Sequence, residues 1–207
     1  MGPVTDHGIP LLESDLDSDP LRQFASWFGE AGTAGVREPE AAALATASAD
    51  GVPSVRMVLV KAFDERGFVF FSDYASRKGR ELAVNPRAAL LFHWDPLGRQ
   101  VRIEGPVEHT SAEESAAYIR TRSRSSQISA LASPQSQTLE SREELERRVA
   151  DLERRYADSE LPMPSSWGGF RLAPEALEFW QQREDRLHDR LRVRRAGDRW
   201  LIERLAP

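Results

Sequence analysis

Apolar residues recur along the chain with two different periods, and each change of period marks an expected element. Residues 1–17 are polar and acidic without any period, which predicts a flexible arm ahead of one domain over 18–207. Asp19 followed by Pro20 is typical of a helix start, because aspartate caps the first turn and proline suits the first helical position. The apolar positions that follow have helical spacing: Leu21, Phe24, Ala25 and Phe28. A helix is therefore predicted over 20–31.

From Ala42 onward, short runs rich in β-branched and aromatic residues replace the helical period. These runs are AAALATAS, PSVRMVLVKAF, GFVFFSD, AALLFHW and RQVRIEGPVEH. Asp50-Gly51 and Arg66-Gly67 punctuate them as turns, and one short helix is expected in SRKGRELAVNP. The pattern predicts a meander of antiparallel strands.

Helical patterns return at 111–122, at 126–132 and in SREELERRVADLERRYADSE. The last of these has an apolar stripe that we expect to face the core: Leu145, Val149, Leu152 and Tyr156. The segment LPMPSSWGG then breaks the chain, and three closing strands are predicted in FRLAPEALEFW, RLHDRLRVRR and DRWLIERLAP. Strands joined in hairpins with few helices predict a mainly β, α+β architecture, an antiparallel barrel with peripheral helices.

Composition narrows the class of protein. The 207 residues are 40% hydrophobic and 29% charged, as in a soluble globular protein, and the absence of cysteine excludes disulfides, thiolate nucleophiles and Cys-ligated metal centres. The histidines form no paired metal motif, so we expect no metal: they are His7, His93, His109 and His188. The net charge of −5 argues against nucleic acid as a partner. No apolar run reaches membrane-spanning length and no secretory pattern is visible, so we expect a cytoplasmic protein without a membrane partner.

The segment SRKGREL predicts an anion site at the start of its helix. With Ser76 as the cap, Arg77 and Lys78 fall in the first turn, where the helix dipole disfavours cations. Two cations there, beside free backbone N–H groups, suit a phosphate. Solvated surface cations would give the same local pattern.

Two further clusters carry similar chemistry. Tyr118 and Arg122 lie four residues apart on one helical face, and Ser126 can cap the next helix. These groups suit a second phosphate. A basic helix end, in which arginine complements the helix dipole, would give the same sequence pattern. Read as a strand, RLHDR places on one face three cationic or titratable side chains: Arg186, His188 and Arg190. A solvated strand face would look the same, and Trp167 and Trp180 are interpreted as core or rim packing. Together the clusters indicate a chain that binds two phosphorylated molecules.

Several motifs in succession resemble the pyridoxamine 5′-phosphate oxidase family: RMVLVK, GFVFFSDYASRKGREL, NPRAALLFHW, RQVRIEGPVE, SQISALASPQS, PSSWGGFRLAPEALEFWQ, RLHDR and the terminal ERLAP. The resemblance covers about residues 20–207. It implies an FMN-binding split barrel and a homodimer with active sites at the subunit interface. The implied activity is oxidation of pyridoxamine and pyridoxine 5′-phosphate to pyridoxal 5′-phosphate by O₂, with release of H₂O₂.

The resemblance also implies site residues, motif by motif. It places FMN contacts on Arg56, Met57, Val58, Leu59, Val60, Lys61, Phe71, Ser72, Arg77, Lys78, Gln100, Gln135, Ser136, Trp180 and Arg190. It places the vitamer phosphate on Lys61, Tyr118, Arg122 and Ser126. Arg186 and His188 would cover the pyridine ring and orient it for catalysis.

The sequence departs from the family pattern at three places. The arm VTDHGIPLLESDL lacks the family's Arg-x-x-Tyr element, Gln182 replaces the glycine after EFWQ, and Ser129 and Leu131 replace glycine and tryptophan in the SQIGAWAS pattern. Two alternatives therefore stay open: a related FMN oxidase of secondary metabolism with a dihydrophenazine-type substrate, and a non-catalytic carrier of flavin or pyridoxal phosphate. A deazaflavin-using reductase on the same barrel is a third.

Overall fold

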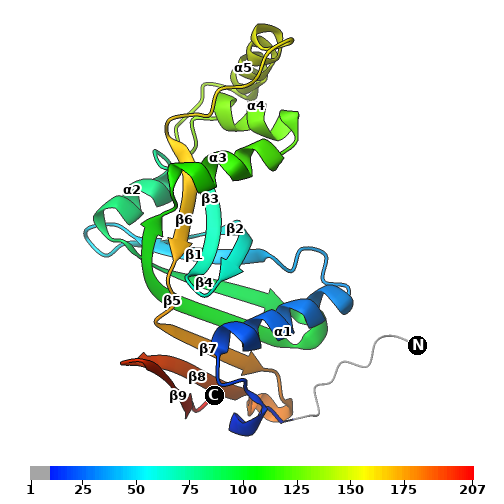
Figure 1. Cartoon of the computed structure of the whole chain (residues 1–207), viewed down its shortest axis with the longest axis vertical. Helices are drawn as coiled ribbons and strands as arrows, with labels where there is room; N and C mark the ends of the chain where they lie inside the picture. Colours follow the sequence, from blue (N-terminus) through cyan, green and yellow to red (C-terminus); the bar gives the residue numbers. More distant parts are fainter. Residues whose placement is uncertain (1–9) are drawn as a thin grey trace.

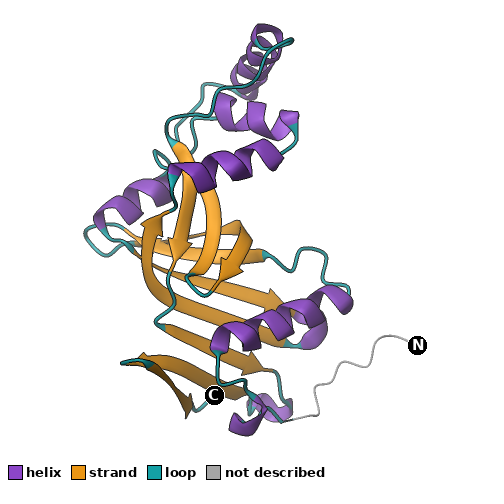
Figure 2. Cartoon of the chain, viewed as in Figure 1, coloured by secondary structure: helices purple, strands orange, loops and turns teal. Residues whose placement is uncertain are grey.

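The computed structural model describes residues 10–207, and strands dominate its architecture (Figures 1 and 2). The strands are β1 Ala41–Ala47, β2 Pro53–Asp64, β3 Gly67–Asp73, β4 Arg87–Trp94, β5 Arg99–His109, β6 Trp167–Leu172, β7 Ala176–Gln181, β8 Asp189–Ala196 and β9 Arg199–Arg204. The α-helices are α1 Pro20–Thr33, α2 Arg77–Val84, α3 Ala112–Thr121, α4 Arg124–Ala132 and α5 Arg142–Arg155. Three short 3₁₀ helices complete the set: η1 Glu13–Asp15, η2 Asp95–Leu97 and η3 Glu184–Arg186.

Six antiparallel strands close into a barrel. Their order is β4-β1-β2-β3-β6-β5, and pairing of β4 with β5 closes the ring. The long strand β5 changes partner along its other edge, because Arg99–Glu104 pairs with β7 and Val107–His109 pairs with β6. From β7 the sheet continues outward through β8 and β9. The predicted antiparallel barrel with peripheral helices is confirmed.

The prediction of three closing strands was wrong, because FRLAPEALEFW forms two strands. Residues 173–175 separate β6 from β7, and the backbone N–H groups of Ala173 and Glu175 instead donate to the carbonyls of Pro106 and Glu104 on β5. Pro174 lies between these two residues and has no N–H to donate, so the break between β6 and β7 leaves no backbone donor unpaired there. The break lets one continuous segment pair with two different stretches of β5.

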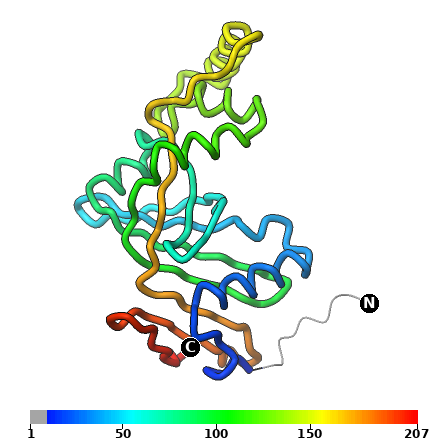
Figure 3. Tube along the Cα trace, viewed as in Figure 1, coloured from blue at the N-terminus to red at the C-terminus, as the bar shows by residue number. Residues whose placement is uncertain are grey.

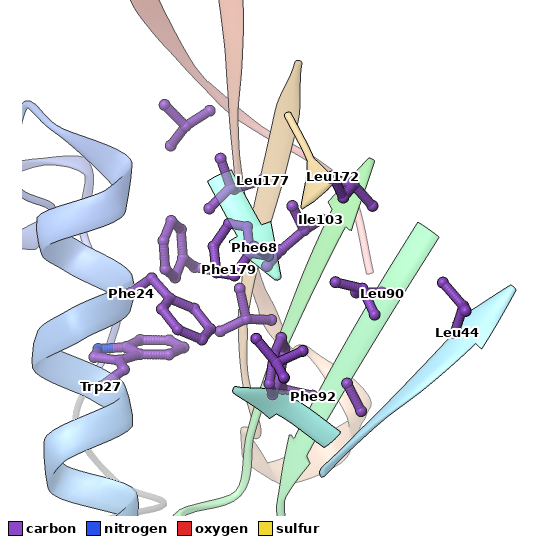
Figure 4. Packing of buried hydrophobic residues seen from close by; sticks show 14 of the residues in the cluster. Phe24, Trp27, Leu44, Phe68, Leu90, Phe92, Ile103, Leu172, Leu177 and Phe179 are labelled. Atoms are coloured by element: carbon purple, nitrogen blue, oxygen red, sulfur yellow. The ribbon is translucent and has the colours of Figure 1, made fainter. Parts of the chain in front are cut away.

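Helix α1 contributes aromatic residues to the core, where they pack against those of the strands. Asp19 accepts a hydrogen bond from the N–H of Leu21 and Pro20 begins the helix, as predicted. The Phe24 ring is fully buried and meets Phe68 and Phe92 edge-on, at centroid distances of 4.8 and 5.0 Å (Figure 4). Such aromatic pairs contribute about 0.5–1.5 kcal/mol each beyond their buried area.

The segment before α1 is packed more closely than the expected flexible arm. Residues 1–9 of that predicted arm lie outside the described residues. Leu11 and Leu16 are buried, and Arg204 of β9 donates to both carboxylate oxygens of Glu13 at 2.9 Å. The C-terminus accordingly lies beside the first described residues (Figure 3). Residues 10–17, which the prediction includes in the flexible arm, thus contact the rest of the structure through two buried leucines and an ion pair.

Helices α3, α4 and α5 extend from one end of the barrel (Figure 1). The stripe of α5 was expected to face the core, but no residue of that helix is buried. Leu145, Val149 and Leu152 are only half-buried, and α5 packs against α4 rather than the barrel. The helical period was therefore right and the predicted packing partner wrong.

Candidate functional site

A half-buried lysine lies at the N-terminus of α2. Ser76 caps this helix, as predicted, and its hydroxyl accepts from the N–H of Gly79. The Lys78 Nζ donates to the oxygens of Ser72, Ser76 and Gln135 at 2.9, 3.3 and 3.3 Å. Burial lowers the pKa of Lys78 and the neighbouring Arg56 lowers it further, with a smaller opposing effect of Asp73. Within residues 10–207 no carboxylate forms an ion pair with Lys78, so its charge is available to an anionic ligand.

Two arginines beside Lys78 share one buried carboxylate. Glu81 accepts from the Nε of Arg77 at 2.8 Å, and its other oxygen lies 3.4 Å from a terminal nitrogen of Arg56. Burial alone would raise the pKa of Glu81, but hydrogen bonds from Ser54, Thr46 and Arg77 outweigh it and lower the pKa to about 2. The carboxylate is therefore ionised at any physiological pH.

An aromatic-walled cavity of about 170 Å³ lies next to this cluster. Its lining includes six of the predicted site residues together with Trp167: Leu59, Lys61, Phe71, Tyr118, Arg122 and Gln135. The rings of Phe71 and Tyr118 stack with centroids 3.9 Å apart, and the guanidinium of Arg122 lies 5.5 Å from the centre of the Trp167 ring. Cations and a phenol at the rim of a flat aromatic wall suit a planar molecule that carries a phosphate.

The helix cap beside this cavity differs from the prediction. Ser123, not Ser126, caps α4, and its hydroxyl accepts from the N–H of Ser126 at 3.3 Å. Ser126 lies in the first turn instead, where its Oγ accepts from the Ser123 hydroxyl at 2.9 Å. Arg122 is the C-cap residue that follows α3 and has extended backbone angles. Tyr118 and Arg122 therefore do not share a helical face, although both line the cavity.

A second group of predicted site residues lies on β5, β7 and β8. The register places Gln100, Trp180 and Arg190 side by side across these strands. Glu178 accepts two hydrogen bonds from Arg190, at 2.8 and 3.2 Å, and is itself buried. The His188 ring lies 4.6 Å from the Trp180 ring between centroids.

The strand predicted from the start of RLHDR begins later than expected, so that prediction was wrong for its first residues. Residues 184–186 form η3, Asp185 and Arg186 have positive φ angles of 54° and 60°, and β8 begins only at Asp189. Arg186 and His188 are therefore carried by a loop, in which Leu187 is exposed. The Nδ1 of His188 accepts from the backbone N–H of Arg183 at 3.1 Å, which leaves the proton of the neutral ring on Nε2.

The Arg186 side chain is exposed. Its guanidinium has no hydrogen-bond or ion-pair partner in the described part of the chain, although most arginines in this protein do. Non-glycine residues with positive φ are uncommon, and their conformation costs free energy that the surroundings must offset. The loop thus has an uncommon backbone conformation at Arg186 and carries its guanidinium without a partner among the described residues.

The two groups of site residues are separated within one chain. One row of the sheet runs through Met57, Ala43, Leu91, Arg102 and Glu178, so that four strand spacings separate β2 from β7. At about 4.8 Å per spacing the path along the sheet is roughly 19 Å. Figure 1 shows α3 and β8 toward opposite ends of the molecule. The predicted site residues therefore form two separate groups within one chain.

The outer face of β2 is apolar and exposed. Val55, Met57 and Leu59 alternate with inward-facing residues, and Met57 is 64% exposed. Cross-strand Leu91 on β4 extends the same surface through Ala43. An apolar patch rimmed by charged residues is typical of a protein interface. Of the predicted cofactor strand, Val58 and Val60 instead face inward, and Val60 is buried.

Sequence reasoning missed two residues of the site. Trp167 was interpreted as packing, yet it lines the cavity and stacks with Phe71, with 5.5 Å between ring centroids. Glu81 was not singled out although it contacts two predicted site arginines. The Gly-Gly pair after Trp167 marks a close approach of the backbone to neighbouring side chains, because a Cβ on Gly169 would overlap Thr110 and lie 2.9 Å from the Phe71 ring. Nothing local distinguishes Glu81 from a solvated helix residue.

Among residues 10–207 no three His, Asp or Glu side chains are grouped closely enough to hold a metal ion. No helix in that range combines the length and the hydrophobicity needed to cross a bilayer.

The chain is similar to known proteins over nearly its whole length. A family model described as "Pyridoxamine 5′-phosphate oxidase" matches residues 28–156, and one described as "Pyridoxine 5′-phosphate oxidase C-terminal dimerisation region" matches residues 167–207. A protein of Rubrobacter xylanophilus named pyridoxine/pyridoxamine 5′-phosphate oxidase is 58% identical over 197 residues, which cover 95% of this chain and 91% of that one. Its namesake from Gluconobacter oxydans is 52% identical over 199 residues, 96% of this chain and 98% of that one.

Solved structures agree with the sequence matches. PhzG from Burkholderia lata 383, crystallised with tetrahydrophenazine-1-carboxylic acid, superimposes with a TM-score of 0.91 and is 37% identical; the match covers 97% of this chain and 98% of that one. A pyridoxamine 5′-phosphate oxidase-related, FMN-binding protein of Nostoc punctiforme is 17% identical with a TM-score of 0.72, covering 91% and 98% of the two chains, and shares the fold.

Proposed function

Because the chain belongs to the pyridoxamine 5′-phosphate oxidase family, we propose that it oxidises pyridoxamine and pyridoxine 5′-phosphate to pyridoxal 5′-phosphate, with FMN as cofactor and O₂ as oxidant. The observation that carries the FMN assignment is the unpaired charge of Lys78 at the capped start of α2. A half-buried cation without a carboxylate partner is costly unless an anion offsets it. The residues present therefore fit a phosphate.

The cofactor phosphate would be held by Arg56, Arg77 and Lys78. All three cations gather around the first turn of α2, where backbone N–H groups add to their field. Ser72 and Gln135, which already accept from the lysine, would contribute polar contacts beside it, with Ser136 next in the chain. When bound, FMN supplies two-electron redox chemistry, in which a hydride is taken from the substrate carbon and O₂ is finally reduced to H₂O₂.

The vitamer would lie in the aromatic-walled cavity. Lys61, Tyr118 and Arg122 line it and would bind the vitamer phosphate through charge-assisted hydrogen bonds, with Ser126 in the adjacent turn of α4. A dianion held by two cations distinguishes phosphorylated from unphosphorylated vitamers, because the dephosphorylated form would leave Arg122 without an anionic partner among the described residues and Lys61 paired only with Glu40, at 3.4 Å. We therefore expect a strong preference for the phosphorylated substrates.

Arg186 and His188 would reach this cavity from a second subunit. A homodimer is supported by the match to the C-terminal dimerisation region, by the exposed apolar face of β2 and by the separation of the two groups within one chain. In that arrangement the loop before β8 would cover the pyridine ring, and the rigid placement of His188 would orient it rather than react with it. Gln100, Trp180 and Arg190 would complete the cofactor site from the same side. A cytoplasmic location stays a prediction.

The test is aerobic turnover of the purified, FMN-loaded protein. Pyridoxal 5′-phosphate is followed by absorbance and H₂O₂ by a coupled peroxidase, with each vitamer phosphate as substrate. One aldehyde and one peroxide per turnover are expected, and pyridoxine without its phosphate serves as the matched control. Absence of turnover with FMN bound would refute the proposal.

A second candidate is oxidation of a reduced phenazine-type ring, favoured by the similarity to PhzG. The retained cations at the cavity argue for a phosphorylated substrate, because a tricyclic acid does not require two cations and a phenol at that position. Faster turnover of a dihydrophenazine carboxylate than of pyridoxine 5′-phosphate would support this alternative. Stable FMN binding without turnover of either substrate would favour the carrier.

A further inference from the structure

Glu81 is a buried acidic residue inside a cluster of cations. Only 6% of its surface is exposed, and its carboxylate contacts Arg56 and Arg77 at 3.4 and 2.8 Å. An anion beside a phosphate site opposes phosphate binding by simple charge repulsion. Its presence there therefore requires an explanation.

Hydrogen bonds hold the Glu81 carboxylate in one position. Ser54 and Thr46 each donate a hydroxyl hydrogen bond to it, and these two residues lie opposite each other on β2 and β1. The same two hydroxyls accept hydrogen bonds from Arg56, whose guanidinium also reaches the carbonyl of Leu44. The carboxylate and the arginine are thus locked into one network on the barrel wall.

The network joins two elements that are distant in sequence. Arg56 comes from β2 and Arg77 from the first turn of α2, and Glu81 is the only carboxylate within the described residues that pairs with both. Without it, the two guanidinium groups would face each other with like charge and no bridge. The formal charge of Arg56, Arg77, Lys78 and Glu81 together is two positive, which matches a phosphate monoester dianion.

We propose that Glu81 is a positioning residue that holds Arg56 and Arg77 side by side in the free protein, ready to receive the phosphate of the cofactor. The inference rests on the proposed function in so far as that phosphate belongs to FMN. Preorganised donors bind more tightly because less side-chain freedom is lost on binding. The carboxylate of Glu81 thereby weakens the electrostatic attraction between the cluster and the phosphate, but it fixes the positions of the two arginines.

Positioning and plain electrostatics predict opposite signs for the neutral variant Glu81→Gln. Removing a negative charge beside a phosphate site tightens FMN binding if charge alone matters. Releasing two arginines from their bridge weakens FMN binding if geometry matters, by about tenfold for one charge-assisted hydrogen bond no longer held in place. The direction of the change therefore decides between the two.

The experiment titrates apoprotein with FMN and follows quenching of flavin fluorescence. Glu81→Gln is compared with the wild type and with Glu175→Gln, a control that removes an exposed carboxylate paired with Arg87. We expect about tenfold weaker FMN binding for Glu81→Gln and unchanged binding for Glu175→Gln. Riboflavin, which lacks the phosphate, serves as the control ligand: its affinity should be the same in Glu81→Gln and wild type if Glu81 positions the phosphate donors, and an equal fall in affinity for both flavins would contradict the inference.

A milder variant guards against failure of Glu81→Gln to fold. Thr46→Val keeps every charge but removes the hydroxyl shared by Glu81 and Arg56, and we expect weaker FMN binding by about three- to tenfold for loss of one hydrogen bond. Equal or tighter FMN binding by these variants, with a wild-type protein that binds FMN, overturns the inference alone. A wild-type protein that binds no FMN overturns the proposed function as well.

Discussion

Lys78 and Arg186 test the assignment of two separate anion-binding roles. Lys78→Met keeps the aliphatic stem of the side chain and removes the charge that reaches Ser72, Ser76 and Gln135. Arg186→Met removes the exposed guanidinium of the loop before β8. We expect Lys78→Met to weaken FMN binding and Arg186→Met to leave it intact while raising the KM for vitamer phosphates.

The magnitude follows from the charge-assisted hydrogen bond that Lys78 would give to the cofactor phosphate. Such a bond contributes about 1.5–3 kcal/mol, which corresponds to about a 10- to 150-fold change in Kd. The free protein should respond in the opposite direction. Because burial lowers the pKa of Lys78, its charged form is disfavoured by folding at neutral pH, and Lys78→Met should leave the apoprotein equally stable or more stable.

Two measurements on the same variants check this reasoning. Fluorescence titration of apoprotein gives the Kd for FMN, and thermal unfolding gives Tm with and without the cofactor. We expect Lys78→Met to lose most of the FMN-induced rise in Tm, and Arg186→Met to keep all of it. Equal loss of FMN affinity in both variants would show that the two roles are misassigned. A large fall in apoprotein Tm for Lys78→Met would contradict the electrostatic reasoning.

Four further predictions concern the interface, the core, the cavity and the response to pH. Met57→Asp places a charge on the exposed apolar face of β2, so sedimentation should show monomers with reduced FMN affinity; an intact dimer would refute the role of this face. Phe24→Ala should lower the free energy of unfolding in urea by about 3–5 kcal/mol, because the ring is fully buried among aromatic partners; a loss below about 1 kcal/mol would contradict this packing. Gly169→Ala puts a Cβ in steric overlap with the Thr110 side chain and 2.9 Å from the Phe71 ring, so these side chains must shift and the vitamer KM should rise in steady-state assays at saturating FMN; an unchanged KM would argue against a shift of the Phe71 ring. The pKa of Glu81 is lowered from 4.5 to about 2, so its ionisation stabilises the fold by about 3 kcal/mol above pH 4.5. That contribution is lost as the pH falls through 2, and the difference in unfolding free energy between wild type and Glu81→Gln should shrink accordingly; a constant difference would refute it.

Much of the local structure follows from the sequence alone. The caps Asp19 and Ser76, the helix that carries Lys78 and the strands around Asp50-Gly51 and Arg66-Gly67 depend on contacts within a few residues, and all are observed as predicted. The order of motifs along the chain also identifies the family, because a succession of spaced motifs is far more specific than any single one. Strand and helix periods therefore determine the class of fold, and the succession of motifs indicates the class of chemistry through the family resemblance.

Tertiary structure decided which of these residues meet. Tyr118 and Arg122 join Lys61 in one cavity only because α3 packs against the barrel wall, and no local pattern predicts that contact. The loop conformation of Arg186 and the bridging role of Glu81 likewise depend on partners far away in sequence. Periodicity records which face of an element is apolar, whereas the partner of that face is selected by long-range packing of the whole chain. The sequence could therefore predict the parts of the site, and only the fold showed that one subunit holds them in two separate groups.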